Sequence, residues 1–293
     1  MKNLRVAVAA MLALPVTAIS QDIATEASVE QVADGIYLIG GANGFSSNIA
    51  LLAGDEHVLL IDNGMAPLGP DLMATIEELA GRAPDFIVNT HHHGDHVGNN
   101  AVFADDGTLV FAHENLRKRV VIDPTAAGGQ TGIPTITFHD EIRFHVNDNQ
   151  AQVIHMPAAH TDGDAIVFFK KKNVIDAGDI MFNYLFPFID LDSGGTVAGY
   201  IAAQQKMVDM SDEETKIIPG HGPLASKADM EANLATLAEG SKRVQALVDD
   251  GKNLAEIQTI NPLADFHDTY NWGFITTERM TATFYRDITG KTE

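Results

Sequence analysis

Short apolar runs separated by turn residues precede the first helical pattern of the chain. Residues 35–40 and 48–52 are β-type runs, and the connection between them, residues 41–47, is rich in Gly, Asn and Ser. This arrangement predicts a hairpin with a mobile connection. Residues 58–61 predict a further strand, because the apolar run ends at Asp62-Asn63-Gly64, a strong turn signal.

A helical period follows over residues 68–79, where Leu72, Ile76 and Leu79 are spaced to share one face. The same criteria predict a series of later elements. We expect strands at residues 86–88, 108–112, 141–146, 152–156, 165–169, 173–175 and 215–218, a loop at 123–134, and helices at 114–121, 197–208 and 226–248. Ser226 and Asp229 predict a capping box at the start of the longest helix.

No segment has the character of a boundary between domains. The chain has no internal repeat, no low-complexity tract and no long linker rich in Pro or Gly. Its 293 residues are enough to bury a substantial core. Strands and helices in this order predict an α/β fold in which layered sheets are covered by helices.

Four histidines and one aspartate follow the strand predicted at residues 86–88, within Thr90-His91-His92-His93-Gly94-Asp95-His96. Imidazole is the commonest transition-metal ligand near neutral pH, and a carboxylate adds an anionic oxygen. An accidental histidine-rich turn is the alternative, but such a tract would not place Gly and Asp directly behind a strand. Because sites in open α/β sheets form at the carboxyl ends of strands, the sequence predicts a metal site here.

Three further residues of ligand type each come just after a later predicted strand. They are His160, Asp179 and His221. Taken alone, each has an ordinary interpretation, as a turn residue, a helix cap or a loop imidazole. Together with the histidine cluster they become candidates for the same metal site.

These motifs, in this order, resemble the metallo-β-lactamase superfamily over nearly all of the chain after residue 20. The motifs are His-x-His-x-Asp-His at His91, His93, Asp95 and His96, Ala-His-Thr at His160, Gly-Asp at Asp179, Gly-His-Gly-Pro at His221, and the earlier Ile-Asp-Asn-Gly at Asp62. The resemblance implies a four-layer αβ/βα sandwich with a two-metal site in a groove at one edge of the sheets.

The resemblance also implies a role for each residue. His91, His93 and His160 would hold one zinc ion, Asp95, His96 and His221 would hold the other, and Asp179 would bridge the two. Three neutral imidazoles leave a position open for water, as catalytic zinc sites require. The other histidines match no ligand position, and we expect surface or supporting roles for His57, His92, His113, His139, His145, His155 and His267.

The implied activity is hydrolysis. Two zinc ions lower the pKa of a water between them and polarise a carbonyl, so the chemistry needs no Ser or Cys nucleophile. Asp95 is the expected catalytic residue, because its carboxylate can orient the hydroxide and carry its proton.

Residues 1–20 have the layout of a signal peptide. Lys2 and Arg5 precede an apolar run at residues 6–16, and Ala18-Ile19-Ser20 forms a small-x-small cleavage site. The run is too short to span a bilayer, and a buried N-terminal helix is the alternative. We therefore expect one catalytic domain at residues 21–293, periplasmic or secreted, with no membrane association after cleavage.

The composition narrows the possible partners. The formal net charge of -21 becomes -23 when residues 1–20, with two basic and no acidic residues, are removed. Such acidity excludes nucleic acid as a natural partner, because phosphate binding needs Lys and Arg. The chain has no cysteine, which excludes disulfides and thiolate metal ligands. A small-molecule acyl substrate remains the expected partner, and the sequence indicates no oligomeric state.

Three reactions remain open. Export favours a lactam, β-lactams included, and we place it first. Asp179 at the bridging position resembles thioesterase, lactonase and glyoxalase II-type members instead, since two lactamase groups have Cys or Ser there. In the Cys group a Lys three residues later holds the β-lactam carboxylate, and here that position is Phe182. The third is an iron-dependent persulfide dioxygenase, in which one iron is held by two His and by the Asp at the Asp179 position. A flavodiiron type is disfavoured, because such relatives have Glu where this chain has His93.

Two segments are expected to shape the pocket. Residues 41–47 would form a lid, and residues 182–189 carry Tyr184, Phe186 and Phe188 just beyond Asp179. Ordinary core packing is the alternative for this aromatic run. An apolar wall with few cations favours a neutral or weakly charged acyl substrate.

Overall fold

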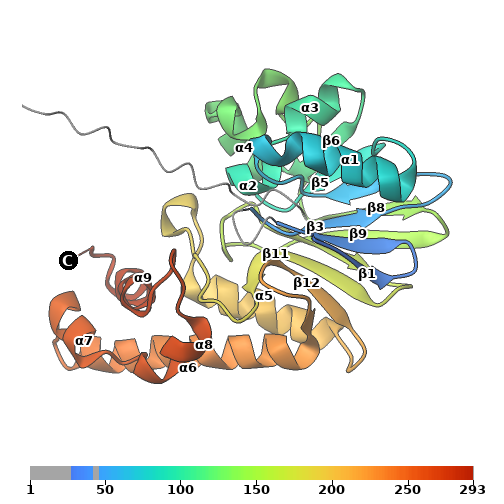
Figure 1. Cartoon of the computed structure of the whole chain (residues 1–293). Helices are drawn as coiled ribbons and strands as arrows, with labels where there is room; N and C mark the ends of the chain where they lie inside the picture. Colours follow the sequence, from blue (N-terminus) through green and yellow to red (C-terminus); the bar gives the residue numbers. More distant parts are fainter. Residues whose placement is uncertain (1–27, 42–45, 293) are drawn as a thin grey trace, which may run out of the picture.

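The computed structural model describes residues 28–41 and 46–292. The predicted signal peptide at residues 1–20 lies outside the described residues, and so does most of the predicted lid, residues 42–45. The described residues form two sheets with helices on their outer faces (Figure 1).

The first sheet has seven strands that follow one another in chain order, antiparallel from β1 to β4 and parallel from β4 to β7. They are β1 (Ser28–Ala33), β2 (Ile36–Gly40), β3 (Ile49–Leu52), β4 (Leu59–Ile61), β5 (Phe86–Asn89), β6 (Leu109–His113) and β7 (Ile136–Phe138). Because β4, β5 and β6 run in parallel, their carboxyl ends meet at one edge of the sheet.

The second sheet has six strands in the order β13-β12-β11-β10-β9-β8. They are β8 (Glu141–Val146), β9 (Asn149–His155), β10 (Ala165–Phe169), β11 (Val174–Phe182), β12 (Lys216–His221) and β13 (Ala225–Ser226). β11 and β12 pair in parallel, whereas the other neighbours are antiparallel.

Helices connect the strands and cover the sheets. The α-helices are α1 (Gly69–Ala80), α2 (Gly94–Val97), α3 (Asn100–Asp105), α4 (Glu114–Ile122), α5 (Val197–Met210), α6 (Lys227–Asp249), α7 (Leu254–Ile260), α8 (His267–Tyr270) and α9 (Thr277–Thr289). Short 3-10 helices are η2 (Ala66–Leu68), η3 (Pro124–Ala127), η4 (Gln130–Gly132), η5 (Leu191–Ser193) and η6 (Ala264–Phe266).

The apolar cores define four layers. Buried residues of both sheets, such as Leu38 on β2 and Phe169 on β10, form the core between the sheets. Leu72 of α1 packs on the outer face of the first sheet, and Met207 of α5 packs on the outer face of the second. Burial of these apolar faces against one another drives the layering. The predicted four-layer αβ/βα architecture is confirmed (Figure 1).

Most elements predicted from the periodicity are present. β2 and β3 pair as the predicted hairpin, and α1 and β8 lie within a residue of their predicted bounds. The capping box of α6 is confirmed, since the backbone N–H of Ser226 donates to the Asp229 carboxylate and the N–H of Asp229 donates to Ser226 Oγ. These segments are local in their determinants, so their patterns suffice to predict them.

Two predicted strand ends were wrong. β11 does not stop at residue 175 but continues to Phe182, and β12 continues through Pro219 to His221. Asp, Gly and Pro are poor strand residues, which hides these extensions in the sequence. Pairing between the two strands overrides that preference, at the cost of register shifts around Gly178. The loop predicted at residues 123–134 contains η3 and η4.

The helices after residue 249 were not predicted from the sequence. α7 and α9 pack with α5 and α6 around a core that includes Leu237, Val244 and Phe284. Gly240 lets α9 approach α6 closely, because a Cβ there would lie 2.8 Å from the Phe284 ring. This packing holds the segment between α8 and α9 beside the edge where the candidate site lies.

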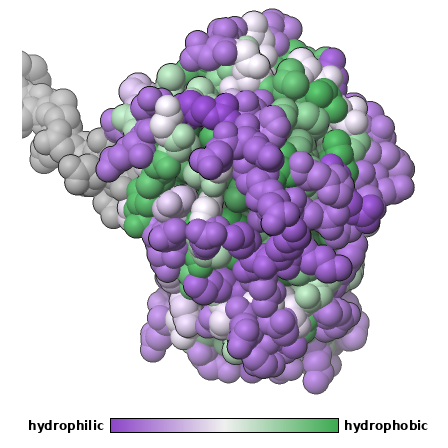
Figure 2. Space-filling model, turned by 90° about the vertical axis from the view of Figure 1, so that its right-hand side faces the viewer, coloured by the Kyte–Doolittle hydropathy of each residue, from purple (hydrophilic) through white to green (hydrophobic). Residues whose placement is uncertain are grey.

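None of the described helices combines the length and the apolar character that a bilayer crossing requires. On the face drawn in Figure 2, hydrophilic residues cover most of the surface and hydrophobic residues gather in smaller areas between them.

The C-terminal helical core gives a stability prediction. Phe284→Ala is expected to lower the free energy of unfolding by about 3–5 kcal/mol, because the ring is buried and its removal leaves a cavity. Ile122→Ala serves as the control, since Ile122 is 84% exposed and its loss should change stability by less than about 0.5 kcal/mol. Urea unfolding measures both, and equal stability of the two variants would contradict this packing.

Candidate metal centre

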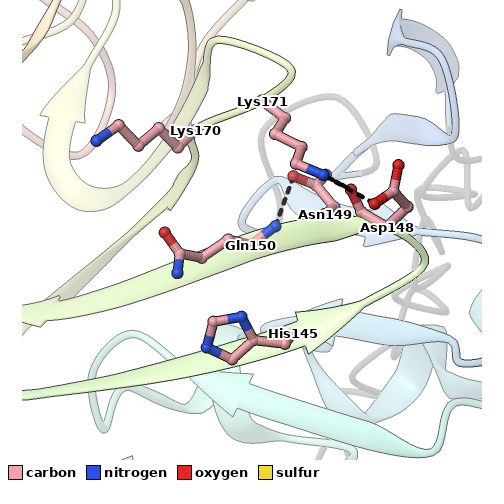
Figure 3. Close-up of a pocket in the computed structure, with 6 residues that line it drawn as sticks. All are labelled: His145, Asp148, Asn149, Gln150, Lys170 and Lys171. Atoms are coloured by element: carbon pink, nitrogen blue, oxygen red, sulfur yellow. Dashed lines mark hydrogen bonds and ion pairs between the residues drawn. The ribbon is translucent and has the colours of Figure 1, made fainter.

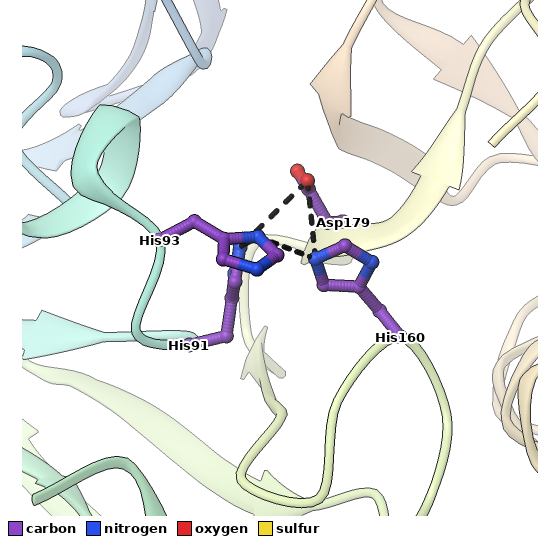
Figure 4. A group of neighbouring side chains, drawn as sticks. All are labelled: His91, His93, His160 and Asp179. Atoms are coloured by element: carbon purple, nitrogen blue, oxygen red, sulfur yellow. Dashed lines mark hydrogen bonds and ion pairs between the residues drawn. The ribbon is translucent and has the colours of Figure 1, made fainter. Parts of the chain in front are cut away.

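All seven sequence-predicted ligand residues come together at one edge of the two sheets. They form two groups whose ligand atoms lie within 4.8 Å of one another. The first group is His91, His93, His160 and Asp179 (Figure 4), and the second is Asp95, His96 and His221. The members come from the turn after β5, the first turn of α2, the loop after β9, and the strands β11 and β12.

The imidazoles of the first group point their ring nitrogens at one another (Figure 4). Nδ1 of His93 lies 3.1 Å from Nε2 of His91 and 2.9 Å from Nε2 of His160. Three ring nitrogens that converge in a buried space are the arrangement that a cation with nitrogen ligands requires.

The Asp179 carboxylate stands between the two groups and turns one oxygen toward each. Oδ2 lies 3.7 Å from His91 Nε2 and 3.5 Å from His160 Nε2. Oδ1 lies 3.0 Å from His96 Nε2 and 3.5 Å from His221 Nε2. Gly220 makes room for this carboxylate, because a Cβ at that position would collide with Oδ1.

Asp95 completes the second group from the first turn of α2. Its Oδ2 lies 3.3 Å from Nε2 of His221 and 3.8 Å from Nε2 of His96. Its side chain is 27% exposed, whereas those of His96 and Asp179 are nearly inaccessible. Asp95 is therefore the more exposed of the two carboxylates that line the cavity.

His96 is oriented by Asp62, which the sequence analysis placed in a structural motif. Asp62 Oδ2 lies 2.7 Å from His96 Nδ1, and the backbone N–H and the hydroxyl of Thr90 both donate to the Asp62 carboxylate. Asp62 adopts a left-handed backbone with φ of 60°, which Asp tolerates better than most residues. With Nδ1 protonated toward Asp62, Nε2 of His96 presents a lone pair to the centre.

His160 and His93 are oriented in the same manner. Nδ1 of His160 donates to the Phe188 carbonyl at 2.6 Å, which leaves Nε2 for the centre. Nε2 of His93 donates to Asp190 Oδ2 at 3.0 Å, which leaves Nδ1. Asp190 was not predicted, because nothing in its local sequence marks it as a partner of a residue 97 positions away.

Burial and neighbouring charges tune these groups. Burial and the nearby imidazoles hold the pKa of His91 well below its ordinary value, and burial lowers the pKa of His160 to about 3. Burial alone would raise the pKa of Asp179, but the imidazoles of His96 and His221 lower it well below its ordinary value. Neutral imidazoles and an ionised carboxylate are the states in which these side chains bind metal.

The donor set fits two cations. Within the described residues, Nε2 of His96 and Oδ1 of Asp179 are buried without a hydrogen-bond partner, although they lie only 3.0 Å apart. Buried polar atoms seldom remain without a partner, and a cation between them would satisfy both. Burial alone would lower the pKa of His96, but three nearby carboxylates raise it well above its ordinary value. Their combined negative charge also indicates a centre that accommodates positive charge.

A cavity of about 470 Å³ opens over the two groups. Its walls are mainly apolar, and the lining comprises Met65, His93, Gly94, Asp95, Asp179, Phe182, Phe188, His221, Trp272 and Phe274. The predicted aromatic run therefore divides: Phe182 and Phe188 line the cavity, Phe186 lies in the C-terminal core, and Tyr184 is exposed. Trp272 and Phe274 lie in the irregular segment between α8 and α9, for which the sequence pattern gave no prediction.

The remaining histidines lie outside the two groups. His113 and His155 stack on each other at 3.6 Å between ring centroids, and His92 lies beside His93 and Asp190. His145 lines a second, open hollow at the β8–β9 turn (Figure 3). There Lys171 pairs with Asp148, and the lining holds no group of three ligand-type side chains among the described residues.

Asp190 and Asp192 provide a matched test of the orienting carboxylate. Asp190→Asn should weaken binding of metal by about 10- to 100-fold, because the amide no longer fixes the tautomer of His93. Asp192→Asn should leave metal binding unchanged, since Asp192 pairs with Arg286 at the surface. Competition with a chromogenic chelator measures both affinities. Equal affinities of the two variants would show that Asp190 does not support metal binding through His93.

Comparisons with known proteins give a family match and several relatives. The family model of the metallo-beta-lactamase superfamily matches residues 42–221. Hydroxyacylglutathione hydrolase of Chelativorans sp. (strain BNC1) is 26% identical over 245 residues, which are 76% of this chain and 85% of that protein. Hydroxyacylglutathione hydrolase of Methylococcus capsulatus is 27% identical over 175 residues, which are 56% of this chain and 60% of that protein.

Two solved structures illustrate the fold. A metallo-beta-lactamase from Pontibacter korlensis has a TM-score of 0.64 and 16% identity, over 72% of this chain and 99% of that one. The inverting sec-alkylsulfatase Pisa1 from Pseudomonas sp. has a TM-score of 0.70 and 15% identity, over 90% of this chain and 50% of that one. These likenesses concern the fold alone. The family match, which spans more than half of the chain, shows that the protein belongs to the metallo-beta-lactamase superfamily of metal-dependent hydrolases.

Proposed function

We propose that the chain is a dizinc hydrolase that cleaves an acyl substrate at its carbonyl group. The two zinc ions would be held by His91, His93 and His160 on one side and by Asp95, His96 and His221 on the other, with Asp179 as the bridge. The observation that carries this proposal is the Asp179 carboxylate, whose two oxygens each face a different group of imidazoles.

Bound zinc ions would supply a water that is deprotonated near neutral pH and would polarise the carbonyl of the substrate. Asp95 acts beside them as the proton carrier. Burial alone would raise the pKa of Asp95, but the neighbouring imidazole of His96 and the hydrogen bond from His221 lower it, so the side chain is a carboxylate at neutral pH. It can therefore orient a water through one oxygen and accept a proton.

The cavity supports an acyl group on the substrate. Phe188, Trp272 and Phe274 give an apolar wall suited to carbon chains or rings rather than to a phosphate ester. Relatives named hydroxyacylglutathione hydrolase support a thioester or ester as the scissile group, and we place these ahead of the lactam favoured by the sequence alone. Two residues also favour a thioester or ester over a lactam. Asp179 stands at the bridging position, and Phe182 stands where one lactamase group has a cation.

Lactam hydrolysis stays the second candidate, because the signal-peptide pattern at residues 1–20 favours a small molecule outside the cytoplasm. We also propose that residues 21–293 act as one exported domain in the periplasm. Mass spectrometry of the mature protein tests the export proposal, which predicts an N-terminus at Gln21. An intact N-terminus at Met1 would contradict it.

A hydrolysis panel with a metal assay tests the activity. We expect two zinc ions per chain, turnover of thioesters and esters, and weaker turnover of lactams. A protein that purifies with one iron and no zinc would overturn the hydrolase in favour of the persulfide dioxygenase. Faster turnover of β-lactams than of thioesters would restore the lactam to first place.

The role of Asp95 has its own test. Asp95→Asn is expected to lower kcat by about 100-fold or more, because an amide cannot accept the proton. Asp249→Asn on the surface of α6 makes the same chemical change far from the centre and should leave kcat unchanged. Full turnover together with full metal content in Asp95→Asn would show that this carboxylate has no catalytic role.

A further inference from the structure

Arg279, in the first turn of α9, is a cation that stands beside two aromatic walls of the cavity. Its Cζ lies 4.3 Å from the ring centroid of Phe274 and 5.6 Å from that of Phe188. Both rings line the cavity over the metal groups. Aromatic faces at this distance stabilise a guanidinium and shield part of it from water, so they hold Arg279 against two rings that line the cavity.

The charge of Arg279 has no carboxylate partner within the described residues. Of the seven arginines in that part of the chain, five have a carboxylate oxygen within 4.0 Å, and only Arg117 and Arg279 do not. Nη1 of Arg279 donates to the Phe274 carbonyl at 2.9 Å. Nε and Nη2 have no hydrogen-bond partner among the described residues, and the side chain is exposed.

Nε and Nη2 share one edge of the guanidinium, and this edge matches the two oxygens of a carboxylate. The same chain shows this geometry at Arg119. There Nε donates to Asp162 Oδ1 at 2.9 Å and Nη2 donates to Asp162 Oδ2 at 2.8 Å. Arg279 presents the same edge without an acceptor among the described residues.

The separation between Arg279 and the two groups of candidate metal ligands suits a substrate of moderate length. The ring of Phe188 lies 5.7 Å from that of His93 on one side and 5.6 Å from Arg279 Cζ on the other. One aromatic ring therefore separates a candidate ligand of the first metal from the cation. A substrate whose carbonyl lies at the metal groups can extend across Phe188 and reach Arg279 with a terminal group.

We propose that Arg279 binds a carboxylate of the substrate at the rim of the cavity, so that the protein acts on acyl compounds that carry a free carboxylate remote from the scissile bond. The proposal rests on the proposed function for the position of the reacting carbonyl. It narrows the expectation of a neutral or weakly charged substrate, which rested on the few cations near the predicted pocket. Arg279 was not considered there, because no helix was predicted after residue 249.

A purely structural role is the competing explanation, because Arg279 also donates to the Phe274 carbonyl and could do no more than hold that loop. The two roles differ in their consequence. Loss of a structural contact would weaken neutral and anionic ligands equally, whereas loss of a carboxylate partner would weaken only anionic ligands. Matched ligand pairs therefore separate them.

Trp272 provides a reporter that does not depend on catalysis. It is the only tryptophan in the chain, and it lines the cavity. The metal-loaded protein is titrated with 4-phenylbutyrate and with the neutral 4-phenylbutanamide, and Trp272 fluorescence gives both Kd values. Arg279→Gln should raise the Kd of the carboxylate by about 5- to 10-fold and change that of the amide by less than about twofold. Arg279→Lys should recover part of the preference for the carboxylate, because Lys keeps the positive charge but lacks the paired N–H donors of the guanidinium.

Arg143→Gln is the control for this titration. It makes the same substitution on β8, where Arg143 pairs with Glu141 away from the cavity, and should leave both Kd values unchanged. Equal weakening of both ligands in Arg279→Gln would assign Arg279 to the loop alone and overturn the proposal. An unchanged preference for the carboxylate would also overturn it, because the carboxylate would then be bound elsewhere.

Kinetics with two esters extend the test to turnover. 4-Nitrophenyl hydrogen glutarate and 4-nitrophenyl valerate have acyl chains of the same length and differ in the terminal carboxylate. Arg279→Gln should raise KM for the glutarate by about 5- to 10-fold, with kcat and the valerate constants nearly unchanged. If the wild type hydrolyses neither ester, the proposed esterase activity is contradicted, and the fluorescence titration still decides the role of Arg279.

Discussion

The structure depends on one buried carboxylate that faces two groups of imidazoles. Asp179 lies inside β11, only 5% exposed, with one oxygen toward His91 and His160 and the other toward His96 and His221. An ionised group at this depth is costly unless positive charge or hydrogen bonds surround it. The imidazoles of His96 and His221 lower the pKa of this carboxylate, and cations held by the two groups would add further positive charge around it.

The two sheets meet this constraint from different directions. β5 brings the histidine cluster to the edge of the first sheet, while β11 and β12 bring Asp179 and His221 to the edge of the second. Irregular pairing at Gly178 and the absence of a side chain at Gly220 provide the space that the carboxylate occupies. Asp62 and Asp190 then orient imidazoles from outside the ligand set. The strands β11 and β12 and the turns that follow β5 and β9 carry most of the ligands, and contacts from distant residues fix the imidazole tautomers.

Much of this arrangement could be predicted from the sequence. The short motifs around His91, His160, Asp179 and His221 identified all the residues that converge, because each motif is local and has a fixed spacing. The extension of β11 through Asp179 was hidden, since Asp and Gly disfavour strands and only pairing with β12 overrides them.

Contacts between distant segments could not be predicted in this way. Asp190 meets His93 across 97 positions, and no local pattern encodes that contact. The segment with Trp272, Phe274 and Arg279 reaches the cavity because α9 packs on α6, which a periodic pattern does not reveal. The candidate metal ligands were therefore predictable from the sequence, whereas the cavity residues of the proposed substrate site required the fold.

The most direct test of the account is anomalous diffraction at the zinc edge from crystals of the metal-loaded protein. We expect two peaks about 3.5–4 Å apart, with the Asp179 carboxylate between them. His91, His93 and His160 should surround one peak, and Asp95, His96 and His221 the other. A single peak, or two peaks that do not share Asp179, would contradict the central claim that this carboxylate joins two metal sites.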